Sequence, residues 1–142
     1  MRFILDTNVV SEWVRPRPDR NVISWLAEAD EDRVFISVVT FAEIRRGLEL
    51  LPMGRRRERL AIWLAEELPA RFEGRILSID RPVAETWGVV TVRAHRAGLA
   101  LGSMDALIAA TAEAHGLTLV TRNVRDFRTA GISLFDAWAP RP

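Results

Sequence analysis

Residues 103–127 read SMDALIAATAEAHGLTLVTRNVRDF and place a helix, a strand and a polar turn in direct succession. Apolar residues recur at helical spacing up to Ala114, and Gly116 is a typical residue for ending a helix. The short run TLVT, residues 118–121, then predicts a buried strand. A helix that leads straight into such a strand is the repeating unit of a parallel sheet.

The same alternation of short strands and helices extends over the rest of the chain. Four more runs predict strands, at residues 2–5, 33–37, 75–79 and 133–135. Apolar spacing predicts helices after Asn8, after a cap at Asp19, twice between Val38 and Leu68, from Pro82 to Ala97, and after a cap at Ser103. We therefore expect a single α/β domain over residues 1–142, in which helices cover both faces of a mainly parallel sheet.

Composition limits the kinds of protein that this chain can be. Its 142 residues, 49% hydrophobic and 27% charged, suit one soluble globular domain. There is no cysteine, which excludes disulfides and thiolate chemistry, and all 20 basic residues are arginine, which excludes mechanisms that need a lysine. No apolar run is long enough for a transmembrane helix, and the opening MRFILDTN lacks the length of a signal peptide. We expect a cytoplasmic protein without membrane contact.

Four acidic residues lie in apolar surroundings and so differ from ordinary surface charges. Asp6 directly follows the first strand, and Glu43 interrupts the apolar opening of a helix. Asp105 lies in the first turn of the helix that begins near Ser103, and Asp126 lies in a loop after the fourth strand. In parallel α/β folds the active site lies beyond the carboxyl ends of the strands, and Asp6 and Asp126 fall there.

Each of these acids also has a purely structural explanation. Asp6 and Asp105 could cap the amino ends of helices, an interaction worth about 1 kcal/mol each. Glu43 could be a solvated helix residue or a partner of Arg46, and Asp126 could be a commonplace loop residue.

Taken together, the four carboxylates indicate a metal site. Carboxylates that converge in a partly apolar cleft repel one another, so a positive group is needed there. With no cysteine and only two histidines, oxygen ligands favour Mg²⁺ or Mn²⁺ over zinc. Such an ion lowers the pKa of a bound water and neutralises charge on a phosphodiester. The residues alone predict an acidic cleft in an α/β domain and leave the substrate open.

Four segments resemble the motifs of PIN domains in their order and spacing. They are FILDTNVVSEW, SVVTFAEIRRGLELL, SMDALIAATAEAHGLTLVTRNVRDF and ISLFDAW. The chain is most similar to the VapC-type toxins of toxin–antitoxin pairs, and among them to the FitB-like branch with its LDTNVxSE opening. The resemblance extends over residues 3–138. It implies a three-layer α/β/α fold with a central, mainly parallel, five-stranded twisted sheet.

The resemblance also implies a function and a set of site residues. The family's first three acids match Asp6, Glu43 and Asp105, and its fourth falls either at Asn123 or at Asp126. Family members are endoribonucleases that use Mg²⁺ or Mn²⁺. A cognate antitoxin inhibits them, promoter DNA is bound only through that antitoxin, and the toxin forms homodimers.

Several alternatives stay open at this point. The chain could be a structure-specific DNA nuclease or a binding module for RNA or antitoxin without catalysis. A haloacid-dehalogenase-like phosphatase fits less well, because that class expects a second aspartate where this chain has Asn8, and a lysine that the chain lacks. The arginine cluster at residues 45–59 could follow an RNA backbone, or it could be the solvated end of a helical hairpin.

Overall fold

The computed structural model describes residues 1–141 and contains one five-stranded parallel sheet. Its strands are β1 (Phe3–Leu5), β2 (Val34–Ser37), β3 (Ile76–Leu77), β4 (Thr118–Val120) and β5 (Leu134–Phe135). They lie in the order β3-β2-β1-β4-β5, and every neighbouring pair is parallel. The central strand β1 pairs with β2 and with β4, so that Ile4 lies opposite both Phe35 and Leu119. The predicted mainly parallel sheet of five strands is confirmed.

Eight α-helices and four 3-10 or π-helical segments connect these strands within residues 1–141. The α-helices are α1 (Thr7–Val10), α2 (Arg20–Glu28), α3 (Val38–Leu50), α4 (Arg55–Ile62), α5 (Leu68–Arg71), α6 (Arg81–Arg96), α7 (Ser103–Ala114) and α8 (Val124–Phe127). The 3-10 segments are η1 (Ser11–Val14), η2 (Glu31–Arg33) and η4 (Arg128–Ala130), and the π-helical segment is η3 (Trp63–Glu67). None of these helices is both long and apolar enough to cross a membrane.

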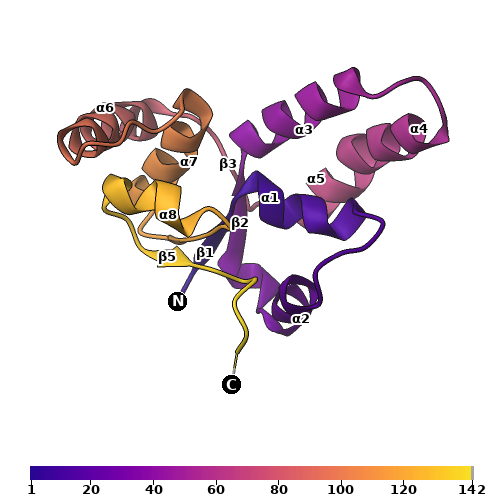
Figure 1. Cartoon of the computed structure of the whole chain (residues 1–142). Helices are drawn as coiled ribbons and strands as arrows, with labels where there is room; N and C mark the ends of the chain where they lie inside the picture. Colours follow the sequence, from indigo (N-terminus) through magenta and orange to yellow (C-terminus); the bar gives the residue numbers. More distant parts are fainter. Residues whose placement is uncertain (142) are drawn as a thin grey trace.

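The helices form layers on both faces of the sheet. Figure 1 shows α6, α7 and α8 on one side and α1, α2, α4 and α5 on the other. A hydrophobic core lies on each face of the sheet. Neighbouring residues of β1 pack into different cores, because side chains alternate between the two faces along a strand. Ile4 packs with Ile108 and Phe127 on one face, and Leu5 packs with Val10 and Phe72 on the other. The expected three-layer α/β/α architecture is confirmed.

The structure corrects three local predictions. Gly102 is the N-cap of α7 and Ser103 is its first residue, with no side-chain capping bond, so the predicted serine cap is wrong. Asp126 lies in the single helical turn α8, where a loop was predicted. The helix expected around residues 60–68 is divided by the π-helical segment η3, and Pro69, which has no backbone N–H to donate, follows directly in α5.

Candidate active site

Asp6 is held rigidly at the carboxyl end of the central strand. Its backbone N–H donates to the carbonyl of Val120 at 2.9 Å, which continues the pairing of β1 with β4. Its Oδ1 accepts a hydrogen bond from the backbone N–H of Thr7 at 2.8 Å, and its Oδ2 accepts one from the Thr121 hydroxyl at 2.8 Å. The side chain therefore caps α1, as one explanation predicted, and also belongs to a polar cluster at the edge of the sheet.

Burial makes Asp6 electrostatically unusual. The residue is only 4% exposed, and this burial raises the pKa of its carboxyl from 3.8 to about 6. The bonds from Thr121 and Thr7 lower the pKa, whereas the negative charges of Asp105 and Glu43 raise it. The carboxylate is thus poorly compensated by the protein, and a cation would stabilise its charged form.

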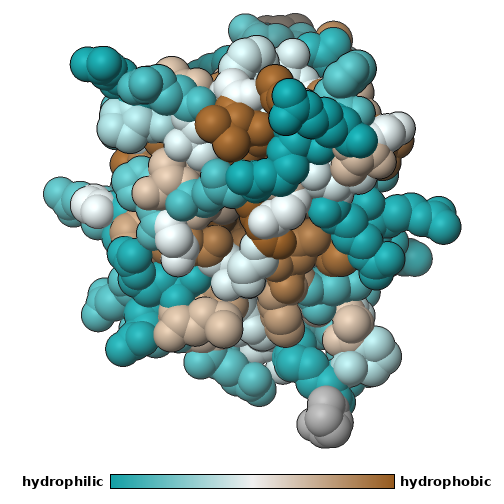
Figure 2. Space-filling view, turned by 90° about the vertical axis from the view of Figure 1, so that its left-hand side faces the viewer, coloured by the Kyte–Doolittle hydropathy of each residue, from teal (hydrophilic) through white to brown (hydrophobic). Residues whose placement is uncertain are grey.

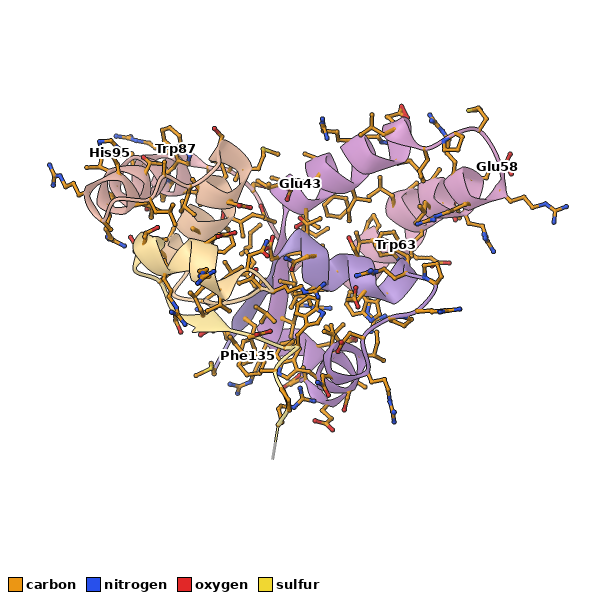
Figure 3. All side chains as sticks on the ribbon, viewed as in Figure 1. Glu43, Glu58, Trp63, Trp87, His95 and Phe135 are labelled. Atoms are coloured by element: carbon orange, nitrogen blue, oxygen red, sulfur yellow. The ribbon has the colours of Figure 1, made fainter. Side chains whose placement is uncertain are left out.

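Glu43 reaches the same cluster from α3. Its Oε1 accepts a hydrogen bond of 2.6 Å from the Thr7 hydroxyl, which also lies 3.1 Å from the hydroxyl of Thr40. Figure 3 shows Glu43 near the start of α3, beside α1. Within residues 1–141 Glu43 forms no ion pair with Arg46, so that structural explanation is wrong.

Asp105 and Asp126 complete the cluster from the other side of the sheet. Asp105 lies half-buried in the first turn of α7, and burial is the largest cause that raises the pKa of its carboxyl. The charges of Glu43 and Asp126 raise it further. Asp6, Glu43 and Asp105 thus influence one another electrostatically, and Asp126 acts on Asp105.

Asn123 and Asp126 differ in what they contribute. Asn123 is the N-cap residue of α8, but its side chain makes no capping bond. Its backbone N–H donates to the Thr121 hydroxyl at 3.0 Å. The side chains of Asn123 and Asp126 are both exposed. Only Asp126 carries a charge, and this charge raises the pKa of Asp105.

Three threonines at the site had no predicted role. Thr121 and Thr40 are fully buried, and their hydroxyls, with that of Thr7, are bonded within the cluster. Buried hydroxyls need a partner, so Thr121, directly after β4, and Thr7, two residues after β1, were a usable signal in the sequence.

The chemistry of the donors suits a hard divalent cation. Within residues 1–141 no three acidic or histidine side chains are arranged so that they alone could ligate one ion. Mg²⁺ commonly binds through only one or two carboxylates and keeps several waters. The buried, undercompensated Asp6 with Glu43 and Asp105 nearby therefore fits such a hydrated ion.

The predicted arginine cluster divides into two parts. Arg57 donates to the Glu49 carboxylate at 2.6 Å and to the carbonyl of Leu51 at 2.9 Å, and so it stabilises the turn between α3 and α4. The other members are exposed: Arg45, Arg46, Arg55, Arg56 and Arg59. RNA binding by these five arginines stays a prediction.

Comparison with known proteins shows the family to which this chain belongs. The model of the family described as PIN domain matches residues 3–132. The chain belongs to the PIN-domain family. Over 136 residues this PIN domain is 38% identical to "Toxin FitB" of Neisseria gonorrhoeae, covering 96% of this chain and 98% of the relative. It is 35% identical over 138 residues to "VapC ribonuclease Y4jK" of Sinorhizobium fredii, covering 97% and 99%.

The fold of this PIN domain is also that of solved toxin–antitoxin complexes. It superposes on a chain of "Structure of FitAB bound to IR36 DNA fragment" with a TM-score of 0.92 and 35% identity, covering 99% of this chain and 98% of that one. The resemblance to the PIN-domain family and to its FitB-like and VapC members is confirmed.

Proposed function

We propose that this PIN domain is the toxin of a type II toxin–antitoxin pair and that it hydrolyses phosphodiester bonds within RNA. The observation that carries the proposal is the buried carboxyl of Asp6 at the end of the central strand, linked to Glu43 through Thr7 and acted on by the charges of Glu43 and Asp105. The names of its relatives support the choice of reaction, since they include a toxin and a ribonuclease at 38% and 35% identity. The cytoplasm, where RNA is available, is the proposed site of action.

Asp6, Glu43 and Asp105 would hold Mg²⁺, or Mn²⁺ in its place, directly or through water. Asp126 would complete the acidic ring, with the neutral oxygen of Asn123 as the weaker candidate for that position. When bound, the ion supplies charge neutralisation at the phosphodiester and lowers the pKa of the attacking water.

Thr7 and Thr121 would keep the carboxylates in place for this chemistry. Thr7 contacts two acids at once, because its backbone N–H bonds Asp6 and its hydroxyl bonds Glu43. Thr121 orients the second oxygen of Asp6. Hydrogen bonds of this kind fix ligand orientation and tune the basicity of the ligand.

Matched RNA and DNA oligonucleotides test the substrate. We expect cleavage of single-stranded RNA in the presence of Mg²⁺, internal cuts on end-labelled substrate, and little cleavage of DNA of the same sequence. Preferred cleavage of branched or duplex DNA would favour the structure-specific nuclease. Binding of RNA without cleavage in any divalent metal would favour the non-catalytic module.

The antitoxin would dock in an apolar hollow beside α4. This hollow of about 510 Å³ is lined by Val14, Leu60, Ile62 and Trp63, among others, and none of the four acids lines it. Figure 3 shows Trp63 on the side of α4 that faces η1 and α1. An antitoxin segment could place an apolar helix there and direct an arginine or lysine to the carboxylates.

Homodimerisation and promoter binding complete the proposed assembly. Figure 2, which views the side that carries α6, shows apolar patches between hydrophilic side chains. Val89 and Val92 of α6 are 55% and 47% exposed, and a second copy of the chain could cover them. Promoter DNA would be bound only through the antitoxin.

A further inference from the structure

Arg122 lies at the rim of the acidic site, and the proposed reaction assigns no role to this residue. It directly follows Thr121, whose hydroxyl holds Asp6, and its backbone N–H lies 3.5 Å from Oδ1 of Asn8. The backbone of Arg122 is thus fixed to the same strand end that carries Asp6, while its side chain is exposed.

The C-terminal tail holds the guanidinium of this arginine. The Arg122 guanidinium lies over the ring of Trp138, 5.5 Å from its centroid. Trp138 is itself fixed, because its carbonyl accepts a bond of 2.9 Å from the Asn21 side chain and its N–H donates to Oδ1 of Asp136 at 2.9 Å. Strand pairing does not account for this arrangement, since β5 ends at Phe135.

The charge of Arg122 is available to a ligand. Among residues 1–141 no acidic side chain forms an ion pair with it. Stacking on an aromatic face leaves the in-plane N–H donors of a guanidinium free, and their fork matches the oxygens of a phosphate. The neighbouring carboxylates repel an RNA backbone, so a cation at the rim offsets part of that repulsion.

We propose that Arg122 binds a phosphate of the RNA strand next to the bond that is cut, and that Trp138 is a positioning residue that holds Arg122 for this contact. The inference rests on the proposed ribonuclease function. Arg122 is the residue that touches the substrate, and Trp138 acts through it.

Equilibrium binding tests the contact without cleavage. The Asp105→Asn background in Mg²⁺ serves as the cutting-deficient protein, and a fluorescein-labelled single-stranded RNA oligonucleotide serves as the probe in anisotropy titrations over a range of salt. Arg122→Ala should weaken binding about 10-fold, the scale of one charge-assisted bond. The slope of log K against log salt should become shallower by about 0.7, the value for one phosphate on a single strand. Arg96→Ala on α6 removes the same charge elsewhere and should leave the slope unchanged.

The tryptophan is tested by a double-mutant cycle. Trp138→Ala should weaken binding less than Arg122→Ala does, and it should have little further effect once Arg122 is alanine. Trp138→Phe keeps an aromatic ring at this position and should retain binding. In the fully active chain, both alanine variants should raise KM more than they lower kcat.

Each failure has a distinct meaning. An unchanged salt slope in Arg122→Ala, with cleavage intact in the wild type, overturns this inference and leaves the ribonuclease in place. Additive effects of the two alanine substitutions overturn the positioning role of Trp138. A wild-type protein that neither binds nor cuts RNA overturns both proposals.

Discussion

The hydroxyl of Thr121 donates a 2.8 Å hydrogen bond to Oδ2 of Asp6, so the first residue after β4 orients the first residue after β1. Both side chains are buried, at 0% and 4% exposure. Because the two strands are neighbours in the sheet, the positions of these side chains are set by backbone pairing on either side. The proposed active site is therefore built into the sheet itself.

Removal of this hydroxyl should weaken catalysis. In Thr121→Val the bond that lowers the pKa of Asp6 is lost, so that pKa should rise further and the acid limb of the pH–rate profile should move to higher pH. We expect activity at pH 6 to fall roughly 10-fold, the scale of a lost ligand-orienting bond. Thr121→Ser keeps the hydroxyl and should remain near wild type; equal losses in both variants would contradict the assigned role.

The raised pKa of Asp6 also makes the stability of the metal-free protein depend on pH. Because the folded carboxyl binds its proton more tightly than the unfolded one, its contribution to stability is lost as pH rises from about 4 to about 6. A shift from 3.8 to about 6 corresponds to roughly 3 kcal/mol. In Asp6→Asn this loss is absent, so the variant should gain stability relative to wild type through that window.

Urea unfolding in EDTA at several pH values measures this difference. The gain in the free energy of unfolding of Asp6→Asn over wild type should increase between pH 4 and pH 6 and then level off. A difference that is constant with pH would mean that Asp6 does not titrate abnormally in the folded chain.

The fourth acidic position should belong to Asp126. Its charge acts on Asp105, so Asp126→Asn should weaken metal-dependent cleavage by roughly 10–100-fold, as is typical of outer ligands. Asn123 has an exposed side chain without a capping bond, so Asn123→Ala should change stability by less than about 0.5 kcal/mol. Asn123→Asp should keep activity or tighten metal binding.

A titration of all three variants with Mg²⁺ and Mn²⁺ decides between the two positions. Unchanged cleavage in Asp126→Asn, together with loss of cleavage in a folded Asn123→Ala, would transfer the role to Asn123.

The apolar hollow predicts a variant that separates inhibition from catalysis. Ile62 lines the hollow and is 54% exposed, so Ile62→Asp should preserve the fold but weaken the antitoxin complex at least about 10-fold, because a charge would be buried on binding. Leu50→Asp, at 70% exposure and outside the hollow, is the matched control. Binding of the co-expressed product of the adjacent reading frame provides the measurement. Equal affinity for both variants would place the antitoxin elsewhere.

The sequence was most informative where the pattern repeats. The alternation of helix and strand predicted the order of the elements and the parallel sheet, and strand ends predicted the location of Asp6. The acids on α3 and α7 were also recognisable, since Glu43 and Asp105 interrupt apolar helix faces.

Other features depended on contacts that no local pattern contains. The turn α8 around Asp126 is too short to show helical periodicity. Ser103 and Gly102 are both acceptable N-caps, so the local sequence does not choose between them, and the structure has the glycine at this position. The bond between Thr121 and Asp6 joins residues 115 positions apart, so only the tertiary fold reveals it.

The most direct test of the central claim measures cleavage of one RNA oligonucleotide by the wild type, Asp6→Asn and Asp105→Asn, with Mg²⁺ and with excess EDTA. Circular dichroism confirms that the near-isosteric variants are folded. We predict cutting by the wild type only with the metal, and a loss of at least roughly 100-fold in each variant, beyond the range of outer ligands. Undiminished cleavage in EDTA, or a fully active Asp6→Asn, would contradict an acidic, metal-dependent site at this edge of the sheet.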